Sequence, residues 1–379
     1  MTPKKTSGIE SAAGHLLIIG FDGQEVTPPL ASLLTRIQPA GVILFARNIV
    51  NAQQTHRLLK DCQACVRQAL FTCVDLEGGR VDRFRNVTGP ASSAAEVFAT
   101  GDRKLFRKHG QIIGKICNTL GFNVDFAPVL DLAFEASRSV MTSRAFSTDP
   151  KAVVLYGREF LAGLRSAGVI GAGKHFPGLG EGNLDSHHDL PVINKSFNNL
   201  WEQDLVPYRV MKRELPMVLV NHANYPAVTR DGLPASLSRK WITNVLRRRI
   251  GYGGMIASDD LEMGGVLKAA PIDEAARGFI RAGGDLCLIC HEEKNVEQAY
   301  DAVVREAHRD SRFRRRVLES AKRVAAFKKK SVELKRGAPA PSPEKISRLS
   351  RQLWEFSERV RFEALSSGTA AGARAGARG

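Results

Sequence analysis

Eight short apolar runs, rich in valine, isoleucine and phenylalanine, recur along the chain at intervals that leave room for a helix between most of them. They occupy residues 16–23, 41–48, 71–79, 122–131, 169–178, 217–226, 253–262 and 285–292. Runs that are apolar throughout, without regular polar alternation, are typical of strands buried on both faces of a parallel sheet. The pattern therefore predicts eight parallel strands.

The segments between the runs carry apolar residues at helical spacing. The clearest example spans residues 105–120, and Gly121 follows it as a C-terminal cap. Asp149 and Pro150 supply an N-cap and a first helical position for a second helix, which ends near Gly168. Eight repeats of strand and helix predict an α/β fold of the (β/α)8 TIM-barrel type. If one run is miscounted, an open doubly wound sheet is the alternative.

Acidic and imidazole side chains gather at the C-terminal ends of these runs. The six are Asp75, Asp131, His175, His222, Asp259 and His291. In a (β/α)8 barrel the C-terminal ends of all strands face one mouth, where active sites lie. Strands commonly end at polar residues, but the convergence of six such groups on one rim favours an active site over that simpler explanation.

Composition is that of an ordinary globular protein. Hydrophobic residues make up 43% and charged residues 25% of the 379 residues, which excludes a wholly disordered chain, a collagen-like repeat and a disulfide-dense mini-protein. The net charge of +16 is unevenly placed, because residues 301–379 hold 20 Lys and Arg against 9 Asp and Glu, a net of +11. Residues 1–300 carry only the remaining +5, so the charge says little about the barrel mouth.

The expected organisation is a single catalytic barrel domain, residues 14–330, after an N-terminal segment of residues 1–13. Residues 331–379 form a basic, low-complexity tail, with a linker at 335–344, a short amphipathic helix, and disorder from 366. The apolar residues of that helix are Leu349, Leu353, Trp354, Phe356 and Val360. The tail lacks a nucleic-acid-binding motif, so a solvated tail is favoured over a nucleic-acid contact.

Targeting signals and cysteines bear on the compartment. The sequence contains no run of about 18 apolar residues and no clear secretory signal, so we expect no membrane span. Two Cys-x-x-Cys pairs, Cys62 with Cys65 and Cys287 with Cys290, raise the alternative of a zinc site. The second pair lies in an apolar strand, where residues three apart point to opposite faces. Buried free thiols explain the cysteines better, and we expect a cytoplasmic protein without a metal.

Residues 168–175, GVIGAGKH, nearly match the phosphate-binding loop pattern G-x-x-x-x-G-K-[ST]. His175 stands where the magnesium-binding hydroxyl is required, and a loop containing glycine and proline follows where that pattern needs a helix. These differences argue against a nucleotide hydrolase.

Two other stretches carry side chains suited to acid–base and nucleophilic chemistry. In KHFPGLGEGNLDSHHDLP (174–191), Asp185 comes two residues before His187 in a glycine-rich loop. A carboxylate held against an imidazole nitrogen fixes the tautomer and raises the basicity of the ring, as a general acid/base needs. In IASDDLEMGG (256–265), Asp259 and Asp260 end a strand, where neighbours point to opposite faces and one can reach the barrel mouth.

Together with VDLEGGRVDRF at 74–84, these motifs resemble the glycoside hydrolase family 3 β-N-acetylglucosaminidases, or β-hexosaminidases, over about residues 14–330. The resemblance implies a (β/α)8 barrel that hydrolyses terminal β-linked N-acetylhexosamine with retention of configuration, without a metal or other cofactor. It also implies a muropeptide substrate and a role in cytoplasmic peptidoglycan recycling.

The resemblance assigns the chemistry to three residues. Asp259 matches the nucleophile that forms a covalent glycosyl-enzyme, His187 matches the acid/base, and Asp185 matches the partner of that histidine. An imidazole, with a reference pKa of about 6.5, can donate and then accept a proton near neutrality. His188 adjoins His187, but the spacing to Asp185 favours His187.

Six further residues match positions that bind the sugar in the family. They are Asp75, Arg83, Arg144, Lys174, His175 and His222. Leu76 and Leu179 depart from the family pattern, which usually has glutamine and histidine at these positions. Neither position is catalytic, so the reaction class is unaffected.

Two kinds of alternative fit the same sequence. A β-glucosidase or an N-acetylglucosaminide phosphorylase is conceivable on the same scaffold, because a histidine acid/base lacks the negative charge that repels an incoming phosphate. A non-catalytic carbohydrate- or nucleic-acid-binding protein is expected to lack Asp259 or His187, and both are present. We therefore expect a small carbohydrate substrate, no nucleic-acid partner and a monomer.

Overall fold

The computed structural model describes residues 8–182, 190–335 and 339–376. Eight parallel strands close into a barrel in the order β1-β10-β9-β8-β7-β6-β3-β2. The barrel strands are β1 (Leu17–Ile19), β2 (Gly41–Ile43), β3 (Phe71–Val74), β6 (Val124–Asp125), β7 (Ile170–Phe176), β8 (Met217–Val220), β9 (Met255–Asp260) and β10 (Leu286–Ile289). Each lies within one of the eight apolar runs, and the predicted (β/α)8 barrel is confirmed.

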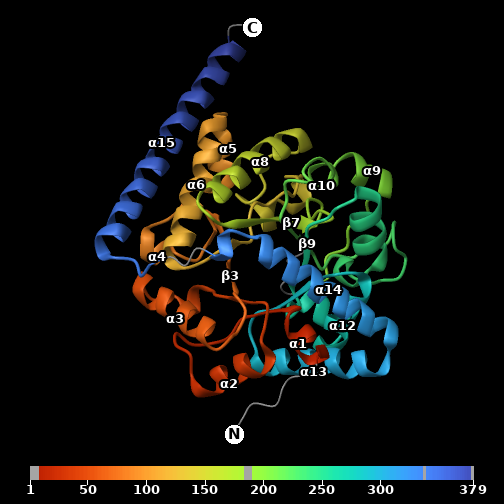
Figure 1. The fold of residues 1–379 in the computed structure, drawn as a ribbon. Coiled ribbons are helices and arrows are strands. Elements are labelled where there is room, and N and C mark those ends of the chain that lie inside the picture. Colours follow the sequence, from red (N-terminus) through yellow and green to blue (C-terminus); the bar gives the residue numbers. More distant parts are fainter. Residues whose placement is uncertain (1–7, 183–189, 336–338, 377–379) are drawn as a thin grey trace.

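Helices surround the barrel (Figure 1). They are α1 (Gly8–Gly14), α2 (Pro28–Ile37), α3 (Ala52–Ala64), α4 (Arg85–Thr88), α5 (Ala94–Ala99), α6 (Arg103–Leu120), α7 (Arg138–Met141), α8 (Pro150–Ser166), α9 (Phe197–Glu202), α10 (Val206–Val210), α11 (Gly264–Leu267), α12 (Ile272–Ala282), α13 (Glu293–Arg309), α14 (Ser311–Lys330) and α15 (Pro343–Gly376), with a π-helical segment, η4 (Lys240–Ile250), and the short 3₁₀ turns η1 (Ala46–Asn48), η2 (Glu135–Ser137), η3 (Ala235–Leu237) and η5 (Glu333–Lys335). The predicted caps are present, because the side chain of Asp149 accepts a hydrogen bond from Lys151 N and Gly121 ends α6 at a φ of 98°.

A short hairpin follows β3 and leaves the barrel wall. The sequence predicts one strand over 71–79, but the structure divides this run into β3 and β4 (Leu76–Gly78), and β4 pairs in antiparallel fashion with β5 (Val81–Asp82). Gly78 and Gly79 both have positive φ, 82° and 59°, which glycine adopts without steric cost. The chain therefore turns back at this point, and the hairpin stands at the mouth of the barrel.

Two hydrophobic layers hold the barrel together. Side chains pointing inward from the strands, such as Phe71, Val124 and Leu288, fill its interior, and side chains pointing outward pack against the helices. Cys287 belongs to the outer layer and Cys290 to the inner one, as expected for strand residues three apart. All six cysteines are free.

Helix α14 closes the end of the barrel opposite the mouth. Its Lys328 is buried, and the ammonium group donates hydrogen bonds to the carbonyl oxygens of Ala40, at 2.6 Å, and Ala69, at 2.7 Å, which precede β2 and β3. The same ammonium lies 4.7 Å from the centre of the Phe71 ring. A buried cation thus donates to two carbonyl groups at the barrel floor, and Ala40 O also accepts a hydrogen bond from Phe71 N at 3.0 Å.

The C-terminal residues differ from expectation. We predicted a short helix and a disordered end from 366, whereas α15 is one helix from Pro343 to Gly376 that packs along α4, α5 and α6 (Figure 1). Its buried residues Leu353, Phe356 and Val360 join the same hydrophobic layer as the barrel helices. Alanine and arginine are strong helix formers, so a low-complexity composition rich in them does not prevent a helix.

Two features of the described residues bear on the class of protein. None of the helices within 8–182, 190–335 and 339–376 combines the length and hydropathy that crossing a membrane requires. Over the same ranges, no group of three or more His, Cys, Asp and Glu side chains has the arrangement of a metal site.

Candidate active site

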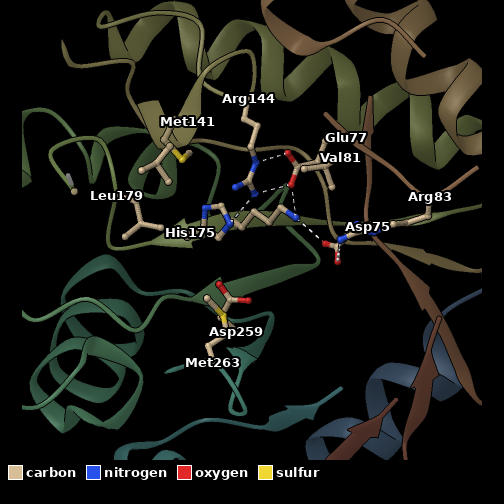
Figure 2. A pocket seen from close by; sticks show the side chains of 13 residues that line it. Asp75, Glu77, Val81, Arg83, Met141, Arg144, His175, Leu179, Asp259 and Met263 are labelled. Carbon is tan, nitrogen blue, oxygen red and sulfur yellow. Dashed lines mark hydrogen bonds and ion pairs between the residues drawn. The ribbon is translucent and has the colours of Figure 1, made fainter. Parts of the chain in front are cut away.

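A pocket of about 120 Å³ opens at the C-terminal mouth of the barrel (Figure 2). Charged side chains from the β4–β5 hairpin, the segment after α7, β7 and β9 surround it, together with several apolar side chains. The lining residues are Asp75, Glu77, Val81, Arg83, Val140, Met141, Arg144, Lys174, His175, Leu179, Gly182, Asp259 and Met263. Six predicted site residues, Asp75, Arg83, Arg144, Lys174, His175 and Asp259, are thus brought together.

One wall of the pocket is a buried network of two cations around Glu77. Arg144 binds its carboxylate in a bidentate manner, with Nε 2.7 Å from Oε2 and Nη2 2.8 Å from Oε1, and Lys174 Nζ lies 2.6 Å from Oε1. Burial opposes ionisation of this carboxyl group, but the charges of Arg144 and Lys174 outweigh it and hold the pKa of Glu77 well below its usual value. Burial opposes the charge of Lys174, but the carboxylates of Asp75 and Glu77 raise its pKa. Lys174 and Glu77 are therefore both ionised.

Asp75 extends this network toward the hairpin. Its Oδ1 accepts a hydrogen bond from Lys174 Nζ at 2.8 Å, and its Oδ2 lies 3.9 Å from Arg83 Nη2. Asp75 and Arg83 are less buried than Lys174, and Figure 2 shows them on the same side of the pocket. Their remaining donors and acceptors are available to hydroxyl groups of a ligand.

His175 is held on two sides. Its Nδ1 lies 2.6 Å from Asp131 Oδ2, and its Nε2 lies 3.2 Å from Arg144 Nη2. A guanidinium can only donate, so Nε2 accepts, and Nδ1 carries the proton that Asp131 accepts. The second oxygen of Asp131 accepts a hydrogen bond from Leu179 N at 2.7 Å. Asp131 therefore fixes both the ring of His175 and the start of the following loop.

Asp259 lies near the end of β9, across the pocket from Arg144 and Glu77 (Figure 2). Its Oδ1 accepts a hydrogen bond from Asp260 N at 3.0 Å. Burial favours the neutral acid, but His175, His222 and Lys174 together hold the pKa of Asp259 below its usual value. The group is therefore an ionised carboxylate that lines the pocket, as a nucleophile requires.

The next residue points away, as the strand alternation predicts. Asp260 Oδ2 lies 3.2 Å from His291 Nε2, outside the pocket lining. His222 is fully buried and does not line the pocket, because its Nδ1 lies 2.7 Å from Ser236 Oγ and its Nε2 lies 2.8 Å from the backbone oxygen of Asp260. The structure thus places His222 behind the strand end that carries Asp259.

The predicted acid/base pair, Asp185 and His187, lies outside the described residues, as does His188. Gly182, which precedes that stretch, lines the pocket.

Sequence reasoning missed two carboxylates of the site. Glu77 was hidden inside a run taken as a single strand, although an acid within an apolar run at a strand end is a signal for a buried ion pair. Asp131 was recognised at the rim but was given no role. Of the two departures from the family pattern, Leu179 lines the pocket, whereas Leu76 packs into the outer hydrophobic layer.

Comparison with known proteins agrees with this arrangement. The sequence profile of the glycosyl hydrolase family 3 N-terminal domain matches residues 9–327. The chain belongs to glycosyl hydrolase family 3. The family resemblance seen in the sequence is thereby confirmed, and the protein is a glycosidase.

Individual members of glycosyl hydrolase family 3 are similar over most of the chain. A β-hexosaminidase of Alkalilimnicola ehrlichii is 38% identical over 296 residues, which cover 76% of this chain and 83% of that protein. One from Bordetella avium is 35% identical over 283 residues, covering 73% and 80%. The structure of a family 3 β-N-acetylglucosaminidase from Paenibacillus sp. FPU-7 has a TM-score of 0.84 at 30% identity, covering 92% of this chain and 68% of that one.

Proposed function

We propose that this family 3 glycosidase is a retaining exo-β-N-acetylglucosaminidase. In this proposal Asp259 is the nucleophile, and His187, paired with Asp185, is the acid/base. The observation that carries the proposal is the ionised carboxylate of Asp259, which faces a single-sugar pocket across from a wall of hydroxyl-binding groups. The relatives named β-hexosaminidase support the choice of sugar.

The polar wall suits the hydroxyl groups of a pyranose. Lys174 and Arg144 donate hydrogen bonds, Asp75 accepts them, and all three are already oriented by ion pairs. Preorganised partners of this kind lose little conformational entropy when a ligand binds. Arg83, 3.9 Å from Asp75, can close onto a hydroxyl from the side of the hairpin.

The opposite side of the pocket is apolar. Met141 and Leu179 lie together across from Asp75 and Arg83, and Met263 lies beside Asp259 (Figure 2). These side chains offer a surface for the methyl group of an acetamido substituent, which glucose lacks. The proposal therefore favours N-acetylglucosamine over glucose.

The pocket volume limits how much sugar can enter. The pocket is small, with a volume of about 120 Å³, which favours binding of one terminal sugar over several. The aglycone must then extend toward the mouth. This supports removal of single terminal residues over cleavage within a chain.

The first chemical step forms the glycosyl-enzyme. A carboxylate oxygen of Asp259 attacks the anomeric carbon, the bond from that carbon to the glycosidic oxygen breaks, and His187 gives its proton to the departing oxygen. Asp185 stabilises the protonated imidazole before the transfer. The wall formed by Lys174 and Arg144 holds the ring while the anomeric carbon moves toward Asp259.

The second step releases the sugar. His187, now neutral, removes a proton from water, the water oxygen attacks the anomeric carbon, and the bond to Asp259 breaks. Two inversions leave the anomeric configuration unchanged. No metal ion or redox cofactor takes part in either step of this proposal.

We further propose that the natural substrate is a muropeptide carrying a terminal N-acetylglucosamine, cleaved in the cytoplasm during peptidoglycan recycling. The support is the family resemblance at the sequence level. Kinetics on N-acetylglucosaminyl-anhydromuramyl substrates against aryl glycosides test it, since equal kcat/KM for both classes contradicts selection of the aglycone.

The assay that tests the function uses 4-nitrophenyl N-acetyl-β-glucosaminide. The wild-type enzyme is expected to release nitrophenol with retention of configuration, and Asp259→Asn is expected to abolish turnover because the neutral amide cannot form the glycosyl ester. Near-wild-type turnover in that variant contradicts the assignment. A preference for the glucoside indicates a β-glucosidase, and a rate that requires added phosphate indicates a phosphorylase.

A further inference from the structure

Helix α15 lies beyond the residues matched by the family profile, yet it packs against helices next to the pocket wall. The ring of Phe356 stacks on the ring of His109 in α6, with centroids 5.7 Å apart and planes inclined by 17°. The next residue of α15, Ser357, has its Oγ 3.1 Å from Ser92 Oγ, and both serines are buried. Two consecutive residues of α15 therefore contact two groups on the barrel side.

Those two groups lie directly against the turn of the β4–β5 hairpin. A Cβ atom placed on Gly78 would collide with the backbone oxygen of Ser92 and lie 3.3 Å from His109 Nε2. The neighbouring Gly79 N donates a hydrogen bond to Ala91 O at 2.8 Å. No free space separates the turn from these groups, so a displacement of His109 or Ser92 displaces the turn.

The turn at Gly78 determines the position of Glu77 in the pocket wall. Gly78 directly follows Glu77, whose carboxylate binds both Arg144 and Lys174. Behind that carboxylate, Gly78 and Tyr156 line a cavity of only about 10 Å³, room for about one water molecule at most. The wall is therefore tightly packed from the pocket back to α6.

The ring of His109 is otherwise fixed from two sides. Its Nδ1 lies 2.7 Å from the hydroxyl of Tyr156, and the ring of Phe160 meets it edge-on with centroids 5.2 Å apart. Burial lowers the pKa of His109 to about 3, outweighing the opposing effect of the Ser92 backbone, so the ring is neutral. Phe356 is the third contact of the ring, since it stacks on one face of His109.

We propose that Phe356 of α15 is a positioning residue for the sugar-binding pocket. By stacking on His109 it holds the turn at Gly78 in place, and the turn holds Glu77 where it orients the two cations of the pocket wall. The inference rests on the proposed function only in taking that wall as the part that binds the sugar.

The test compares variants of one helix in the full-length enzyme. Phe356→Ala removes the stacked ring, and we expect KM for 4-nitrophenyl N-acetyl-β-glucosaminide and Kd for N-acetylglucosamine to rise about three- to tenfold. We expect kcat to change by less than about twofold, because the nucleophile on β9 is untouched. Phe356→Tyr keeps the ring and is expected to restore the wild-type KM.

The matched control is Leu353→Ala, which shortens another buried residue of α15 that belongs to the same hydrophobic layer. It is expected to lower the melting temperature with KM unchanged. Trp354→Ala, at a side chain that is 64% exposed, is expected to alter neither. If Phe356→Ala fails to fold, Phe356→Leu removes the stacking while keeping apolar volume.

The outcomes separate the two proposals. An unchanged KM and Kd in Phe356→Ala, or an equal rise in Leu353→Ala, overturns the positioning role, because α15 then acts only on global stability. A wild-type enzyme that binds N-acetylglucosamine without hydrolysing the glycoside contradicts the proposed function. In that case the Kd comparison still decides the role of Phe356.

Discussion

The ammonium group of Lys174 lies 2.6 Å from Glu77 Oε1, in an ion pair whose side chains are only 4% and 5% exposed. Charges so deeply buried are costly unless they are fully paired. Arg144 completes the pairing of Glu77, and Asp75 completes that of Lys174. The pocket wall is therefore a closed electrostatic unit, in which the loss of one member leaves an unpaired buried charge.

Glu77→Gln tests this unit. The amide keeps the shape but loses the charge that neutralises Arg144 and Lys174, so we expect the free energy of unfolding to fall by about 3 kcal/mol and KM to rise. Urea denaturation and steady-state kinetics measure the two effects.

Glu214→Gln is the matched control for that substitution. Arg158 binds Glu214 in the same bidentate geometry, at 2.7 and 2.8 Å, but on the surface, with side chains 43% and 39% exposed. Loss of this surface ion pair in Glu214→Gln is expected to lower the free energy of unfolding by about 1 kcal/mol or less, with unchanged KM. Equal losses of unfolding free energy in Glu77→Gln and Glu214→Gln would show that burial of the Glu77 ion pairs does not increase their contribution to stability.

The pH dependence of stability follows from the same pair. Because the pKa of Glu77 in the folded protein is held below the usual 4.5, its stabilising contribution is fully present above about pH 5 and is lost as pH falls through the folded-state value. We expect the difference in unfolding free energy between wild type and Glu77→Gln to shrink as pH decreases from 5 toward 2. A difference that stays constant over this range contradicts a depressed pKa.

Asp131 and Asp125 allow one substitution to be compared in two settings. Asp131 accepts hydrogen bonds from both His175 and Leu179 N, so Asp131→Asn turns an NH2 group toward one of these donors and is expected to cost about 1–3 kcal/mol. The kcat/KM value is also expected to fall, because the ring of His175 loses its orientation.

Asp125 is equally buried, but burial raises the pKa of its carboxyl group well above the usual value, which favours the neutral acid. Its Oδ1 accepts one hydrogen bond from Leu76 N. Asp125→Asn keeps that acceptor and neutrality, and we expect nearly wild-type stability and kcat/KM. A large loss of stability in Asp125→Asn, together with a small one in Asp131→Asn, would show that Asp125 and not Asp131 needs its carboxylate charge.

The strand pattern predicted the barrel well because every barrel strand is buried on both faces and reads as an apolar run. Asp75, His175 and Asp259 follow from the rule that strand ends converge on one mouth, and they do meet there. Arg83, Arg144 and Lys174 are assigned from the family resemblance instead. The rule gives the edge at which a side chain lies but not its contacts. It therefore did not separate pocket residues from His222, which faces Ser236 and a backbone oxygen.

Two other differences between prediction and structure, the hairpin within residues 71–79 and the length of α15, can be traced to particular residues. Two consecutive glycines with positive φ turn the run at 71–79 into a hairpin, and this turn, invisible in hydropathy, puts Glu77 into the pocket. The sequence predicts a short helix around Leu353 and Phe356 but not the full length of α15, because the composition after residue 366 resembles that of a disordered tail. Its packing depends on Leu353, Phe356 and Val360, whose partners lie more than 200 residues away in sequence.

We expect Lys328, at the barrel floor, to make the free energy of unfolding increase with pH. Burial lowers the pKa of its ammonium group from 10.5 to about 7, so the folded protein binds fewer protons than the unfolded chain between these values. The contribution of Lys328 to stability therefore increases as pH rises from about 7 to 10.5. The difference in unfolding free energy between wild type and Lys328→Met is expected to shift in favour of wild type over this range, and a pH-independent difference contradicts the lowered pKa.

In the proposed mechanism, His222 supports the nucleophile Asp259 from outside the pocket lining. Burial lowers its pKa, and the neutral ring donates from Nε2 to the backbone oxygen of Asp260 while Nδ1 accepts from the hydroxyl of Ser236. His222→Ala leaves that backbone oxygen without its donor and loosens the strand end. We expect kcat to fall about tenfold, which corresponds to about 1.4 kcal/mol of transition-state stabilisation, with little change in KM.

Two further variants distinguish this role from sugar binding. His222→Gln keeps a donor of similar reach and is expected to recover part of kcat. Ser236→Ala removes the hydroxyl that fixes Nδ1 and is expected to give a smaller loss than His222→Ala. A rise in KM with unchanged kcat in His222→Ala would instead place this histidine among the groups that bind the sugar, because an interaction equal in ground and transition states affects binding alone.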